Sequence, residues 1–86
     1  MTVADDINTI CFSAPVGLSV YSITSVTKNS PLSVGGILLN ISRYNPLNTY
    51  SVIFQLLIPA EVTDQLIYRT IHVISNNVTI KEWSML

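Results

Sequence analysis

Few side chains in this sequence are of the types that carry out acid–base, nucleophilic or metal chemistry. The chain has one histidine, His72, one cysteine, Cys11, and five carboxylates. His72 is the only plausible general base, but such a base needs an orienting carboxylate and a nucleophile, and no motif supplies them. We therefore expect His72, between Ile71 and Val73, to lie on a sheet face or at a subunit contact.

Cys11 lies between Ile10 and Phe12, a setting typical of a small buried hydrophobic side chain. A reactive thiol is usually activated by a neighbouring cation, and the nearest one in the sequence, Lys28, is distant along the chain. A single cysteine also excludes a disulfide within the chain. The sequence thus predicts an unreactive thiol.

The spacing of the remaining candidates fits no known chemical motif. No ligand pair occurs at CxxC or HxxxH spacing. The adjacent Asp5 and Asp6 are not followed by a calcium loop, and Gly35-Gly36 lacks the GK[ST] of a phosphate loop. We interpret the carboxylates as a solvated end or a contact with a basic partner, and the glycines as a bulge or strand entry. The sequence predicts no catalytic residue, no metal site and no cofactor, and we expect that the protein is not an enzyme.

The composition favours association with other subunits. Charged residues make up 10% of the 86-residue chain, against roughly 25% in an average soluble domain, and hydrophobic residues 49%. A domain of this size buries only about 60 to 65% of the surface of its unfolded chain. Small proteins usually add disulfides, a metal or oligomerisation to such a core. With the first two unsupported, the sequence predicts an oligomer.

The charge pattern bears on partners and location. The net charge is −1, and the four cations, Lys28, Arg43, Arg69 and Lys81, do not cluster. Binding to a phosphate backbone needs a basic patch, so nucleic acid is not an expected partner. The acidic start has no secretory pattern, and no run reaches the roughly 18 apolar residues of a membrane span. We expect synthesis in the cytoplasm and no membrane.

Alternation of apolar and polar residues, with turn signals every ten to twelve residues, predicts an all-β fold. The expected architecture is a small antiparallel β-sandwich or barrel of about six strands, in a single β domain spanning residues 1–86. The expected strands cover residues 9–12, 18–26, 36–42, 50–58, 66–75 and 78–83. A single helical turn near residues 60–64 is compatible with this arrangement, and a longer helix after Pro59 is the less favoured alternative because the segment is rich in β-branched residues.

The strand at 50–58 is the clearest. Its first face carries Tyr50, Val52, Phe54, Leu56 and Ile58, and its second carries Ser51, Ile53, Gln55 and Leu57. Because the second half is apolar on both sides, we expect this strand to lie centrally in its sheet or beneath a partner. The segment 75–77 predicts a tight turn, and hence an antiparallel hairpin between the last two strands.

Two apolar clusters are candidate interface residues, because aromatic residues and methionine are enriched in interface cores. The first gathers around the turn at 45–48, and the second forms the C-terminal end. Their members are Tyr44, Pro46 and Tyr50, and Trp83, Met85 and Leu86. For Trp83, insertion into the domain's own core is an equally good interpretation. For the Tyr44–Tyr50 loop, recognition of a glycan or peptide is the alternative.

These features point to a structural role. We expect a non-enzymatic assembly subunit that reinforces a larger lattice, such as a bacteriophage capsid decoration (cement) protein. Its partners would be copies of itself, with a trimer favoured, and a lattice such as a major capsid protein. Its location would be the virion, at the capsid surface. The alternative is a small β-sandwich binding module that recognises glycan or peptide through the Tyr44–Tyr50 loop.

Overall fold

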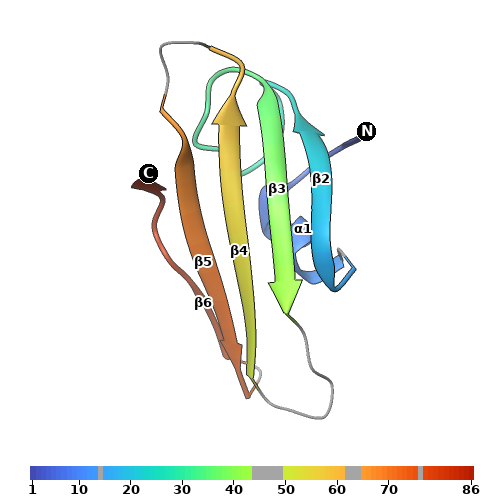
Figure 1. The fold of residues 1–86 in the computed structure, drawn as a ribbon, viewed down its shortest axis with the longest axis vertical. Helices are drawn as coiled ribbons and strands as arrows, with labels where there is room; N and C mark the ends of the chain where they lie inside the picture. Colours follow the sequence, from blue (N-terminus) through green and yellow to red (C-terminus); the bar gives the residue numbers. More distant parts are fainter. Residues whose placement is uncertain (14, 44–49, 62–64, 76) are drawn as a thin grey trace.

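In the computed structural model, the chain forms one open mixed β-sheet with a short helix on one of its faces (Figure 1). The structure describes residues 1–13, 15–43, 50–61, 65–75 and 77–86. The helix, α1, spans Ile7–Ser13. The strands are β1 (Thr2–Val3), β2 (Gly17–Ile23), β3 (Gly36–Arg43), β4 (Tyr50–Pro59), β5 (Ile67–Ile74), β6 (Asn77–Ile80) and β7 (Ser84–Met85).

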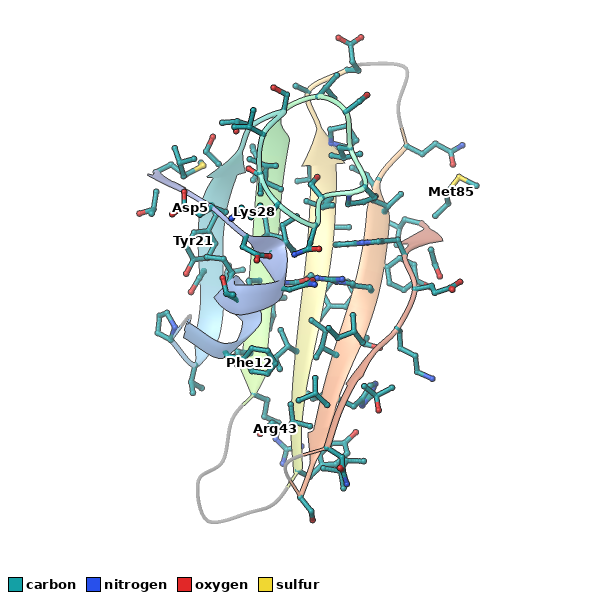
Figure 2. The ribbon with its side chains drawn as sticks, turned by 180° about the vertical axis from the view of Figure 1, so that it is seen from behind. Asp5, Phe12, Tyr21, Lys28, Arg43 and Met85 are labelled. Atoms are coloured by element: carbon teal, nitrogen blue, oxygen red, sulfur yellow. The ribbon has the colours of Figure 1, made fainter. Side chains whose placement is uncertain are left out.

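The strand order follows the sequence, β1-β2-β3-β4-β5-β6, and β7 pairs with β5 beside β6. All neighbours are antiparallel except β1 and β2, which pair in parallel. The all-β fold class is therefore confirmed. Where the prediction named a sandwich or barrel, the structure has a single open sheet, and α1 with the loop at 24–35 occupies the place of a second sheet (Figure 2).

Four of the expected strands occur with small changes at their ends, as β2 to β5. Only the first part of the strand expected at 78–83 occurs, as β6; Lys81, Glu82 and Trp83 are in no strand, and β7 begins beyond them at Ser84. The predicted hairpin between the last two strands is confirmed, because β5 and β6 pair antiparallel and Ser75 in the turn has a φ of 48°. The helical turn expected near 60–64 and the turn at 45–48 fall largely or wholly outside the described residues.

The expected strand at 9–12 is wrong, because this segment belongs to α1. The two-residue spacing of Ile10 and Phe12 suggests a strand, but the spacing that matters is that of Ile7 and Ile10. Three residues apart, they lie on one side of a helix, and both pack in the core while Phe12 is exposed. Pro15 follows soon after the helix, at a place where helices commonly end.

Asp6 is the N-cap of α1. Its carbonyl accepts the first helical hydrogen bond from Ile10 N at 3.2 Å, and its Oδ1 accepts from Asn8 N at 2.9 Å. The same Oδ1 accepts from Asn29 Nδ2 at 2.7 Å, and Asp5 O accepts from Lys28 N at 2.9 Å. Figure 2 shows Asp5 and Lys28 beside the start of the helix. The Asp6 carboxylate thus caps α1, and this carboxylate together with the Asp5 backbone carbonyl joins the start of the helix to the loop at 24–35.

Replacing Asp6 by alanine is expected to lower the free energy of unfolding by about 1 kcal/mol at neutral pH, the usual cost of losing an N-cap. Hydrogen bonds, first from the Asn29 side chain and then from Asn8 N, lower the pKa of Asp6 below its ordinary 3.8, against the opposing effect of desolvation. This stabilisation is present above the unfolded-state pKa and is lost as the pH falls through the folded-state pKa.

Chemical denaturation at several pH values tests this linkage. Asp6→Asn keeps an oxygen acceptor but cannot titrate. Its free energy of unfolding should therefore fall less steeply than that of the wild type between about pH 5 and pH 2. Parallel profiles for the two proteins would contradict the assigned role of the carboxylate.

The hydrophobic core lies between α1 and the sheet. Its first cluster joins the helix to the sheet, with Tyr21, Leu32, Ile67 and Trp83 packed around it. The buried members of this cluster are Ile7, Ile23, Leu38 and Leu57. A second cluster, Ile53 and Ile71 with Val73 against it, continues the core along β4 and β5.

A row of polar side chains crosses this covered face in register, formed by Asn40, Gln55 and Arg69. All three are buried, with exposed fractions of 0, 0 and 5%. Arg69 Nε donates to Gln55 Oε1 at 2.8 Å, and Gln55 Nε2 donates to Asn40 Oδ1 at 3.0 Å and to Ile7 O at 3.2 Å. Arg69 Nη2 also donates to Asn8 Oδ1 at 2.7 Å. The row therefore ties α1 to the centre of the sheet.

The two adjacent glycines allow close backbone approach where β3 begins. A Cβ on Gly35 would lie 2.8 Å from Ile23 O, and one on Gly36 would collide with the carbonyl oxygen of Ile58. Gly36 pairs with Ile23 on one side and Pro59 on the other. The expectation of a strand entry at this position is confirmed.

Candidate interaction surface

On one face of the sheet, no layer formed by the described residues is packed (Figure 1). Figure 1 shows this face toward the viewer, with α1 behind the strands. Cross-strand partners share a face, so the register defines its members from β2 to β5. We use the name open face for the ten large apolar side chains of its central part, with Tyr50 and Ile74 on the same side at its margin near the hairpin turn. The ten are Leu18, Val20, Ile37, Leu39, Ile41, Val52, Phe54, Leu56, Ile58 and Tyr68.

Burial divides the two faces sharply. Every buried residue of β2 to β5 lies on the face that α1 covers, and none lies on the opposite side. On the open face, Leu18 is 62% exposed, Ile41 45% and Val20 38%. The other members shield one another only in part. Contiguous apolar patches of this kind on a small protein usually mark an interaction site.

The open face is almost without charge. Within β2 to β5, the only charged residue in register with it is Arg43, which is exposed at the end of β3. Arg69, the other charged residue of these strands, belongs to the buried polar row on the opposite face. The centre of the open face therefore offers no ionic group to a partner, and its burial leaves no charge unpaired.

Three polar side chains of β4 and β5 lie at the border of the open face, near the hairpin turn. The Tyr50 hydroxyl lies 3.1 Å from His72 Nδ1, and His72 Nε2 lies 3.2 Å from Thr70 Oγ1. Phe54 stacks on Tyr68 further along, with ring centroids 5.9 Å apart. His72 is thus partly buried on a sheet face, in the position that the sequence predicts, and both ring nitrogens contact hydroxyl groups.

The structure separates the candidate interface residues. Tyr44 and Pro46 lie outside the described residues, and Tyr50 is 39% exposed at the border of the open face. Trp83 packs against the core on the opposite side, with Arg69 Cζ 4.4 Å from its ring centre. Its partial burial agrees with the interpretation of Trp83 as part of the domain's own core.

The C-terminal residues lie at the margin of the sheet. Met85 in β7 and Leu86 are each 71% exposed, although Leu86 N donates to Leu66 O at 2.9 Å. Figure 2 shows Met85 at the edge of the molecule, remote from α1. These two side chains are available for contact, but they do not adjoin the centre of the open face.

The open face as a whole was not among the candidate sites, although a signal for it exists. Strand β4 is apolar on both sides over its second half, and α1 covers only one of those sides. The side that includes Phe54 and Leu56 is the more apolar of the two and yet is the uncovered one. The alternation in the sequence identifies two faces, but only the register shows which one α1 covers.

The side chains that could bind a metal or act as a nucleophile do not form a second site among the described residues. Among the described residues, no three His, Cys, Asp or Glu side chains gather in a way that could hold a metal ion. Cys11 lies in α1, but its side chain is outside the described part of the structure. In that same part of the chain, no helix has the length and apolar character needed to span a bilayer.

The fold and this surface define a small open-sheet β protein with one apolar face uncovered. Comparison with known proteins adds no relative: no family model, no curated protein and no solved structure matches the chain. Any functional conclusion therefore rests on the geometry and chemistry of the surface itself.

Proposed function

We propose that this protein is a non-enzymatic structural assembly subunit that acts by burying its open face against another protein. The observation that supports this most directly is the uncovered apolar face of the sheet, on which Leu18, Val20 and Ile41 are the most exposed members in β2 and β3. Hydrophobic contact is worth roughly 25 cal/mol per Å² of apolar surface removed from water. Such a face stabilises an assembly without any chemical step.

The narrower form of the proposal is a virion component of the same kind as a bacteriophage capsid decoration protein, which forms an oligomer and reinforces a capsid lattice. Its support is the small size, the 10% of charged residues and the abundance of neutral polar residues in the sequence. In this role the protein would be located at the capsid surface, with copies of itself and a major capsid protein as its partners.

The mass of the protein in solution tests the proposal. Light scattering on a sizing column, across a roughly hundredfold dilution, should give a single defined oligomer of the 9.5 kDa chain that persists over most of the range. A clean monomer throughout would contradict an assembly role. A threefold ring, which would suit the threefold sites of a lattice, corresponds to three times the chain mass.

The alternative function is a binding module that uses the Tyr44–Tyr50 loop. Of the two tyrosines that bound this loop, the structure describes only Tyr50. Tyr50 is partly exposed, but its hydroxyl contacts His72 Nδ1. A glycan or peptide array with wild type and Tyr44→Ala distinguishes the two functions. Retention by the wild type that is lost in the variant, with no change in oligomer mass, would favour the binding module.

A further inference from the structure

We propose that the open face is covered by a second copy of this chain, so that two sheets pack face to face in a two-fold dimer with a shared apolar core. This inference rests on the proposed assembly function and names the partner. In this dimer the central strands are buried on both faces. One face is covered by α1 and the loop at 24–35, and the other is covered by the open face of the partner. The sandwich that the sequence pattern indicates is then completed between chains.

The dimensions of the face suit such a dimer. The molecule measures 41 × 24 × 18 Å, and Figure 1 views it along the shortest axis, toward the open face. The apolar part of the open face covers four strands, which are about 4.8 Å apart and rise about 3.3 Å per residue. Projected on a plane, its area is about 450 Å², without the extra surface of the side chains. The outline of the whole face is about twice that area. These values bracket the roughly 800 Å² that each partner contributes to a standard interface.

The charge distribution favours a second copy over a foreign protein. Self-pairing is penalised when like charges are brought together, but the open face has a single cation in register with it, Arg43 at its end. A foreign partner is commonly selected by complementary charges and polar groups. The centre of this face presents none, and two apolar sheet faces can pack on each other without them.

The shape favours two-fold closure. Sheets that pack face to face lie about 10 Å apart, with their strands about 30° from parallel. One sheet face then covers one other, and the same residues are used on both subunits. A threefold ring would leave part of each open face uncovered.

The matched variants Ile41→Lys and Ile80→Lys test the inference. Ile41 lies on the open face in β3 and is 45% exposed, whereas Ile80 in β6 pairs with Ile71 on the opposite side and is 40% exposed. The two substitutions introduce the same charge at β-strand positions of similar exposure. Circular dichroism confirms that each variant is folded, and light scattering across the dilution series gives its mass.

We expect the wild type and Ile80→Lys to have twice the 9.5 kDa chain mass. Ile41→Lys should be a folded monomer, with the affinity of the dimer lowered by about a hundredfold or more, because an unpaired charge is buried in the contact. An oligomer mass that is the same in the wild type and in Ile41→Lys would overturn the open-face dimer while leaving the assembly function intact. A trimer that Ile41→Lys disrupts would overturn only the two-fold arrangement, whereas a monomeric wild type would overturn both proposals.

Discussion

Replacing Gly36 by alanine is expected to lower the free energy of unfolding by about 3 kcal/mol or more, at the upper end of the cost of overpacking. A methyl group at this position would collide with the carbonyl oxygen of Ile58, and Pro59 Cα lies only 3.2 Å from the same point. Both neighbours are backbone atoms, so no side chain can rotate away. Strands β3 and β4 would have to separate at the pair formed by Gly36 and Pro59.

Chemical denaturation followed by the fluorescence of Trp83, the single tryptophan, measures this effect. Gly17→Ala is the matched control, because a Cβ there has nothing within 4 Å but the residue has a φ of 98°. Its cost should be about 1 to 2 kcal/mol from backbone strain alone. The proteins should be compared at equal concentration, since association adds to apparent stability. A smaller loss for Gly36→Ala than for Gly17→Ala would contradict the close approach.

Long elements of this fold could be predicted from the sequence more readily than short ones, because a longer segment repeats its apolar spacing more often. Strand β4 is ten residues long, enough for its two faces and its central position in the sheet to be recognised even though its second half is apolar on both sides. The seven residues of α1 provide only two turns, and within them Ile10 and Phe12 match a strand as well as Ile7 and Ile10 match a helix. The cap at Asp6 distinguishes the two, but its partner Asn29 is distant in the sequence.

The candidate site was harder to predict, because exposure depends on contacts between distant segments. Judged by composition, the side of β4 with Phe54 and Leu56 should be the buried one, and the side with Ser51 and Gln55 the solvated one. The structure has the opposite arrangement. Gln55 is buried because Asn40 and Arg69 occupy the same row on the neighbouring strands, a fact that only the register provides.

The direction of the hydrogen bonds in this row leads to the second large effect. Arginine can only donate, so Arg69 Nε fixes the oxygen of the Gln55 amide toward itself. Gln55 Nε2 must then point toward Ile7 O and Asn40 Oδ1. Asn40 is left with its Nδ2 buried and without a hydrogen-bond partner among the described residues. The polar groups of the row therefore have hydrogen-bond partners at Gln55, whereas the amide nitrogen of Asn40 at its end has none among the described residues.

Gln55→Leu is expected to lower the free energy of unfolding by about 3 to 5 kcal/mol, because it removes the partner of three buried groups at a cost of about 1 to 3 kcal/mol each. Those groups are Arg69 Nε, Asn40 Oδ1 and Ile7 O. Gln65→Leu, the same change at an exposed position, should alter the value by less than about 0.5 kcal/mol.

Asn40→Leu distinguishes the directional network from simple burial. Asn40 is as fully buried as Gln55, so a cost set by burial alone would be similar for the two substitutions. In the network, removing Asn40 leaves Gln55 Nε2 with its bond to Ile7 O and eliminates the unpaired Nδ2. We therefore expect Asn40→Leu to change the free energy of unfolding by no more than about 1 kcal/mol. Equal losses for Asn40→Leu and Gln55→Leu in urea denaturation would show that the amides are not oriented as described.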